Sequence, residues 1–78
     1  MTLIYSAGYQ RFLVRLRQAR EDARMTQEQA AAALGRRQSF LSKCESGERR
    51  VDVEDLRRFA LLYRKPLSFF VDEPQPSA

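Results

Sequence analysis

Residues 26–47 read TQEQAAAALGRRQSFLSKCESG, and the spacing of caps and glycines in this stretch decides the fold. Thr26 with a glutamine three residues later is a capping-box pattern, which predicts the start of a helix. The alanine-rich helix that follows should end at Gly35, because glycine readily adopts the left-handed conformation found at helix ends. Another short helix should run from Gln38 to about Glu45, with a glycine after its end. Two short helices joined by a tight break are therefore predicted.

The flanking segments also have helical patterns, and none has a strand pattern. Ser6 can cap a helix over about residues 7–23 that has an arginine-rich polar face, and Asp52 can cap another helix after the central pair. Pro66 can open a last short helix, PLSFFV, before the pattern is lost in the tail at 72–78. The sequence thus predicts an all-α, compact, five-helix single domain over 1–78, with its core at about 7–71. The apolar residues expected to face inward in the two flanking helices are Phe12, Leu13, Leu16, Ala19, Ala23, Leu56, Phe59, Ala60 and Tyr63.

Length and composition restrict the class of protein. The chain has 78 residues, 44% hydrophobic and 31% charged, so it should fold but has no room for a large internal cleft or a sensor domain. The single cysteine cannot form an internal disulfide. The first residues lack the basic and apolar regions of a signal peptide, and no apolar run reaches the roughly 18 residues of a membrane span. A cytoplasmic protein is expected.

The charge is unevenly distributed along the chain. Of the net charge of +4, residues 1–24 carry +3, residues 25–47 carry +1, and residues 48–78 are neutral. A basic balance is typical of nucleic-acid binders, although many other proteins share it. The positive excess lies in and before the quoted stretch.

Enzymatic function is not expected. The chain has no histidine, no second cysteine, no glycine-rich phosphate loop and no carboxylate pair in an apolar setting. These absences leave no nucleophile and base that could work together and no usual zinc site. The sequence therefore predicts no catalytic residues, no metal and no cofactor.

The quoted stretch has the pattern of a helix-turn-helix: a short helix, a break that contains glycine, and a second short helix. In this motif the second helix enters the DNA major groove. The alanines before Gly35 fit this interpretation, because small side chains let two helices cross closely. The alternative is a generic helical bundle in which Gly35 only ends a helix.

The chain also resembles the Cro/repressor-type helix-turn-helix regulators, often called the xenobiotic-response-element family. The resemblance covers roughly residues 9–71 and depends on RLRQAREDARMTQEQAAAALG, QSFLSKCESG, VEDLRRFALLY and PLSFF, in the order and spacing usual for the family. It implies a compact, five-helix, lambda-repressor-like domain that binds double-stranded DNA and acts in transcription.

The resemblance implies that Gln27 contacts a phosphate and braces Gln38, which reads a base. The chemistry agrees, because a glutamine amide can donate and accept at the edge of adenine and a lysine such as Lys43 can donate to guanine. Phe40 could touch a thymine methyl or a sugar, or pack on the preceding helix. The base-reading candidates are Gln38, Ser39, Phe40, Ser42 and Lys43.

Phosphate contacts are expected at both ends of the reading helix, where amides and guanidinium groups can bracket the groove. Arg37 replaces the small capping residue that is common at its position, so spare N–H groups there could bind a phosphate. The alternative is a solvated charge run. The phosphate-binding candidates are Gln27, Arg36, Arg37, Ser46, Arg49 and Arg50.

Two further positions have structural interpretations. The resemblance implies a salt bridge between Arg20 and Glu45 that locks the first helix to the end of the third. Cys44 occupies a position that is commonly apolar, so core packing is expected, with a redox switch as the alternative.

The last helix suggests a second copy of the chain. Phe69 and Phe70 are adjacent and cannot both face inward on one short helix, so one should be exposed unless a partner covers it. We expect a homodimer that binds a two-fold-symmetric operator as a repressor or an activator. The rival hypothesis is an antitoxin-like or adaptor module that uses the same surface to bind another protein. The interface candidates are Leu67, Phe69, Phe70 and Val71, and Ile4 and Tyr5 could join them or seal the bundle.

Overall fold

The computed structural model describes residues 6–71, which contain five α-helices and no strand. The helices are α1 (Ala7–Asp22), α2 (Gln27–Ala33), α3 (Gln38–Ser46), α4 (Val53–Tyr63) and α5 (Leu67–Phe70). The predicted all-α, five-helix fold is confirmed. Within the described part of the chain, no helix has the length and apolar character needed to cross a membrane. The predictions for Ile4, Tyr5 and the tail at 72–78 lie outside the described residues.

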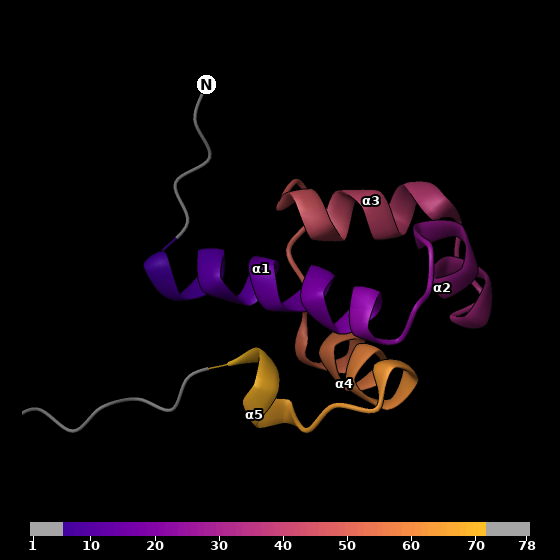
Figure 1. Ribbon diagram of the computed structural model, residues 1–78. Coiled ribbons are helices and arrows are strands. Elements are labelled where there is room, and N and C mark those ends of the chain that lie inside the picture. The colour runs from indigo at the N-terminus through magenta and orange to yellow at the C-terminus, as the bar shows by residue number, and fades with distance from the viewer. Residues whose placement is uncertain (1–5, 72–78) are drawn as a thin grey trace, which may run out of the picture.

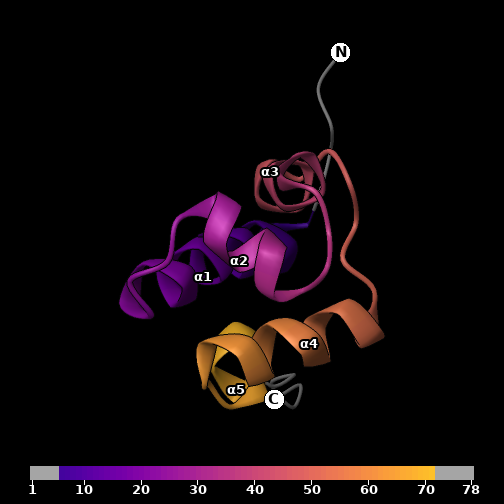
Figure 2. The same cartoon turned by 90° about the vertical axis from the view of Figure 1, so that its right-hand side faces the viewer.

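Helix α1 lies in the middle of the molecule, with α3 on one side and α4 and α5 on the other (Figure 1). Helix α2 packs against α3, and α5 packs against both α1 and α4. Figure 2 shows the same arrangement from the side, with α3 and the α4–α5 pair at opposite ends of the molecule. Two separate surfaces result, one on α3 and one on α4 and α5.

Local capping explains where three of the helices begin. The side chains of Ser6 and Asp52 each accept a hydrogen bond from the backbone N–H three residues later. At α2 the capping box is complete: Thr26 Oγ1 accepts from the Gln29 N–H at 3.0 Å, and Gln29 Oε1 accepts from the Thr26 N–H at 2.9 Å. Each such cap typically contributes about 1 kcal/mol. The three helix starts that the sequence predicts are therefore confirmed.

The helix ends follow the expected pattern at two glycines and depart from it at two arginines. Gly35 and Gly47 have φ of +68° and +87°, the left-handed conformation that glycine adopts easily. Arg24, after α1, and Arg64, at the end of α4, adopt the same conformation with φ of +58° and +56°. A side chain in this region costs roughly 1–2 kcal/mol, so these two ends are strained.

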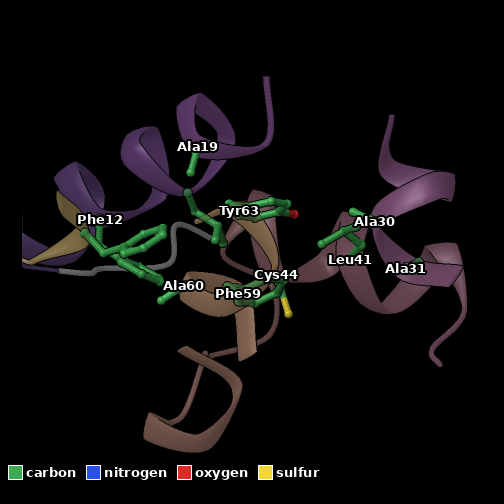
Figure 3. Close-up of a cluster of buried hydrophobic side chains, with 11 residues drawn as sticks. Phe12, Ala19, Ala30, Ala31, Leu41, Cys44, Phe59, Ala60 and Tyr63 are labelled. Carbon is green, nitrogen blue, oxygen red and sulfur yellow. The ribbon is translucent and has the colours of Figure 1, made fainter. Parts of the chain in front are cut away.

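The buried side chains of all five helices form one core, most of which is seen in Figure 3. The small residues Ala30 and Ala31 are almost fully buried, which lets α2 approach α3 closely. The core residues are Phe12, Leu16, Ala19, Ala30, Ala31, Leu41, Cys44, Phe59, Ala60, Tyr63 and Phe70, with Leu13, Ala23 and Leu56 only partly buried at its edge.

The two adjacent phenylalanines of α5 have different roles. Phe70 is fully buried and lies 6.4 Å from Phe12 between ring centroids, so it attaches α5 to α1. Phe69 is only partly buried and meets the Phe70 ring edge-on at 5.4 Å. As expected, only one of the two rings faces fully inward, and this ring is Phe70.

Candidate nucleic-acid interface

Helix α3 presents a polar outer face and an apolar inner face. Leu41 and Cys44 are fully buried, and Glu45 beside them is 4% exposed. The exposed outer face consists of Gln38, Ser39, Ser42, Lys43 and Ser46. Because α4 and α5 lie at the far side of α1, they leave this face uncovered (Figure 1).

The position of α3 relative to α1 is fixed by a two-pronged ion pair. Arg20 Nε donates to Glu45 Oε2 at 2.6 Å, and Arg20 Nη2 donates to Glu45 Oε1 at 3.1 Å. A further donation from Arg20 Nη1 to the Met25 carbonyl, at 2.9 Å, holds the guanidinium in place. Hydrogen bonding to Glu45 raises the pKa of Arg20. The structure thus brings together the two residues for which the resemblance implies a salt bridge.

The same carboxylate begins a chain of hydrogen bonds that leads to the surface. Gln27 Nε2 donates to Glu45 Oε1 at 3.1 Å, which turns the Gln27 amide oxygen toward Gln38. Gln38 Nε2 then donates to Gln27 Oε1 at 3.4 Å. This leaves the Gln38 amide oxygen and one of its N–H groups for an outside partner. Arg17 Nε lies 3.9 Å from Glu45 Oε1 and adds a second cation that the sequence did not indicate.

The start of α3 is electrostatically suited to an anion. Arg37 is the N-cap residue, and its side chain makes no capping hydrogen bond. The first turn of α3 therefore lacks the side-chain acceptor that Thr26 supplies to α2. Helix starts of this kind carry a partial positive charge and attract phosphates.

A positively charged hollow of about 400 Å³ lies beside this helix start. Within residues 6–71, Arg36, Arg37 and Arg49 have no carboxylate partner, whereas Lys43 Nζ lies 3.9 Å from Glu48 Oε2. The hollow is lined by Gly35, Arg36, Arg37, Ser39, Phe40, Lys43 and Arg49. Predicted base-reading and phosphate-binding residues thus meet at one place.

Phe40 packs inward at the edge of this hollow. Its ring lies nearly parallel to that of Phe59, with centroids 6.4 Å apart and 17° between planes. The guanidinium carbons of Arg36 and Arg49 lie 3.8 and 5.0 Å from the Phe40 centroid. The packing partner on α4 was not among the alternatives that the sequence suggested.

The segment after α3 is held by a second aromatic residue that sequence reasoning missed. Tyr9 accepts a hydrogen bond from the Val51 N–H at 2.9 Å, and Arg50 lies over the Tyr9 ring at 4.8 Å. Ser46 Oγ donates to the Lys43 carbonyl at 3.2 Å and accepts from the Glu48 N–H at 3.3 Å. Both ends of α3 therefore carry positioned polar groups.

The opposite surface, on α4 and α5, is apolar. Leu61 is 81% exposed, Leu67 48% and Val71 44%. A groove of about 370 Å³ runs between the two helices, and Arg57, Ala60, Leu61, Lys65 and Leu67 line it. Of the interface candidates, Phe70 is fully buried as a core residue and is therefore not on this surface, whereas Leu61, which the sequence did not indicate, is exposed there.

Residues 11–66 match a family described as a helix-turn-helix domain. The match covers well over half of the chain, and the chain therefore belongs to the helix-turn-helix domain family. This membership supports DNA binding, with a role in the regulation of transcription, and such domains are typically not enzymes. No curated protein and no solved structure matches the chain significantly. Among residues 6–71, no cluster of three or more potential metal ligands is present.

Proposed function

We propose that the protein is a small, dimeric transcriptional regulator of the Cro/repressor type, in which α3 reads the major groove of a two-fold-symmetric operator. The observation that carries the proposal is the hydrogen-bond chain from Arg20 through Glu45 and Gln27 to Gln38. It ends on an amide at the exposed start of α3 and limits the ways in which that amide can turn. We place this helix-turn-helix domain in the cytoplasm and propose that it acts without metal or cofactor.

Gln38 is the proposed main reader of sequence. With one N–H given to Gln27, its remaining N–H and its oxygen match the acceptor and donor of adenine in the major groove. Ser39, Ser42 and Lys43 lie on the same exposed face and would contact neighbouring bases. One good pair of contacts to a base discriminates by about 1–3 kcal/mol.

Phosphate contacts would set the register of α3 in the groove. Gln27 and the uncapped helix start lie before the reading face, and the segment held by Tyr9 lies after it. Contacts on both sides would fix the helix without reading the sequence. The proposed phosphate-binding residues are Gln27, Arg36, Arg37, Ser46, Arg49 and Arg50.

The exposed apolar residues of α4 and α5 would form the homodimer interface. Leu61, Leu67 and Val71 are large apolar side chains in contact with solvent, and Phe69 is partly exposed beside them. Because α4 and α5 lie apart from α3, two copies could join through them while both reading helices stay uncovered. A two-fold dimer would place its reading helices about 34 Å apart, one turn of DNA.

The same apolar surface supports the rival function, an antitoxin-like or adaptor module in which another protein covers α4 and α5. The groove of about 370 Å³ between these helices is the observation that favours it. In that case DNA binding would be secondary.

Selection of bound fragments from random duplex DNA tests the proposal. We expect enrichment of an inverted repeat whose half-sites lie one helical turn apart. Failure to enrich any sequence, with binding that depends on salt alone, would reject specific recognition and favour the protein-interaction module.

A further inference from the structure

Phe40 connects two arginines that come from opposite ends of α3. Arg36 precedes the helix and Arg49 follows it, yet both guanidinium carbons lie within 5.0 Å of the same ring centroid. The Phe40 ring is itself stacked on Phe59, which is fully buried. One aromatic ring, supported by the core, therefore lies beneath two positive charges.

Stacking leaves the hydrogen-bonding capacity of a guanidinium intact. When the face of a guanidinium stacks on a ring, its five N–H donors lie in its plane and point outward from its edge. Within the described residues neither arginine has a carboxylate partner, and both line the hollow beside α3. Their donors are thus available to an anion outside the chain.

A fixed arginine also binds more tightly than a mobile one. A free arginine side chain samples many rotamers, and binding a phosphate must order it, which weakens the net affinity. A ring that already holds the guanidinium removes part of this entropy loss before DNA arrives.

We propose that Phe40 is a positioning residue for phosphate binding, which holds Arg36 and Arg49 together so that both contact the phosphates of one DNA strand. The inference rests on the proposed function and changes the role of Phe40, from a candidate base reader to a support for two phosphate-binding arginines. Both guanidinium groups lie against the same ring, so Phe40 keeps them in one region of the surface, where they could contact adjacent phosphates of one strand.

The salt dependence of DNA binding by the full chain provides the test, because its slope counts phosphate contacts, at roughly 0.9 per phosphate. Phe40→Leu keeps an apolar side chain against Phe59 but removes the aromatic face. We expect this variant to bind at least about fivefold more weakly at low salt, with a slope shallower by roughly one to two. Phe40→Tyr, the matched control, keeps the ring and should retain the slope of the unaltered protein.

A double-mutant comparison adds a readout that a purely structural role would not change. Arg49→Ala should weaken DNA binding less in the Phe40→Leu variant than in the unaltered protein, because in that variant the ring no longer holds Arg49 in place. Phe40→Leu that folds and binds with an unchanged slope would overturn the inference and leave the proposed function standing. A natural chain that binds no duplex would instead refute the proposed function itself.

If Phe40→Leu fails to fold, nuclear magnetic resonance of the unaltered protein still decides the question. The side-chain protons of Arg36 should be shifted upfield by the Phe40 ring in the free protein and remain shifted when a duplex is added. Unshifted protons, or shifts that vanish on binding DNA, would overturn the inference.

Discussion

Arg20 and Glu45 lie 25 residues apart in the chain and meet through two hydrogen bonds, the shorter of 2.6 Å, between α1 and α3. The Glu45 side chain is 1% exposed and that of Arg20 13%, so the pair lies largely out of water. Breaking this pair should therefore cost more unfolding free energy than breaking a salt bridge on the surface.

Removal of Arg20 should strongly destabilise the fold, because the buried Glu45 carboxylate then loses its bidentate partner and keeps only the Gln27 amide and the more distant Arg17 guanidinium. We expect Arg20→Met to lower the free energy of unfolding by about 3–5 kcal/mol. Urea denaturation measures the effect, and Glu48→Gln, which breaks the exposed pair with Lys43, is the control with a loss of about 1 kcal/mol or less. Equal losses for the two variants would contradict a structural role for the buried pair.

The left-handed Arg64 offers a stabilising substitution. Arg64→Gly should relieve the strain at φ of +56° and raise the free energy of unfolding by up to about 1 kcal/mol. The matched control is Arg57→Gly, within α4, which should lower it by about 1 kcal/mol. Thermal unfolding of both variants checks the opposite signs, and a destabilising Arg64→Gly would show that the arginine side chain outweighs its backbone strain.

The Cys44 thiol should be unreactive in the folded protein. Burial raises the pKa of Cys44 from 9.0 to about 11, so little thiolate is present at pH 8. We expect iodoacetamide at pH 8 to modify the native chain far more slowly than the chain unfolded in urea. Comparable rates would restore the redox switch as a hypothesis, since they would require an accessible thiolate.

Charged residues on the apolar surface should prevent dimerisation. Leu61→Glu and Leu67→Glu would each place a carboxylate in the proposed interface, where its burial is costly. Light scattering should show a shift from dimer to monomer, with a circular dichroism spectrum like that of the unaltered chain. Val14→Glu introduces the same charge at a 69% exposed site on α1 and should leave the dimer intact. A dimer that survives both leucine substitutions would have its interface elsewhere.

Helix starts and inward faces were predictable from the sequence because their causes are local. Thr26 bonds with Gln29 three residues away, and the apolar spacing in α1 directly specifies its buried side. The ends at Arg24 and Arg64 were not predictable, since arginine has no local preference for the left-handed conformation. At both ends the backbone closes the helix with hydrogen bonds, from the Met25 N–H to the Arg20 carbonyl and from the Lys65 N–H to the Ala60 carbonyl, although the residue itself does not favour the conformation.

The candidate site also has features that the sequence predicts and features that depend on contacts between distant segments. The position of Gln38 on an exposed face follows from helical periodicity, and the structure places the residue there. The contacts of Tyr9 with Val51, 42 residues away, and of Phe40 with Phe59 depend on how distant segments meet. A four-residue helix is too short for periodicity to say which of Phe69 and Phe70 faces inward.

The central claim is that the Gln38 amide reads a base, and its most direct test compares Gln38→Ala with the unaltered protein on duplexes that differ at one base pair of the selected operator. Competition binding measured by fluorescence anisotropy should show that the unaltered chain prefers adenine at one position by about 1–3 kcal/mol. The variant should lose that preference while it retains most of its affinity for random DNA. An equal preference in both proteins would contradict the account, because sequence would then be read by a different part of the molecule.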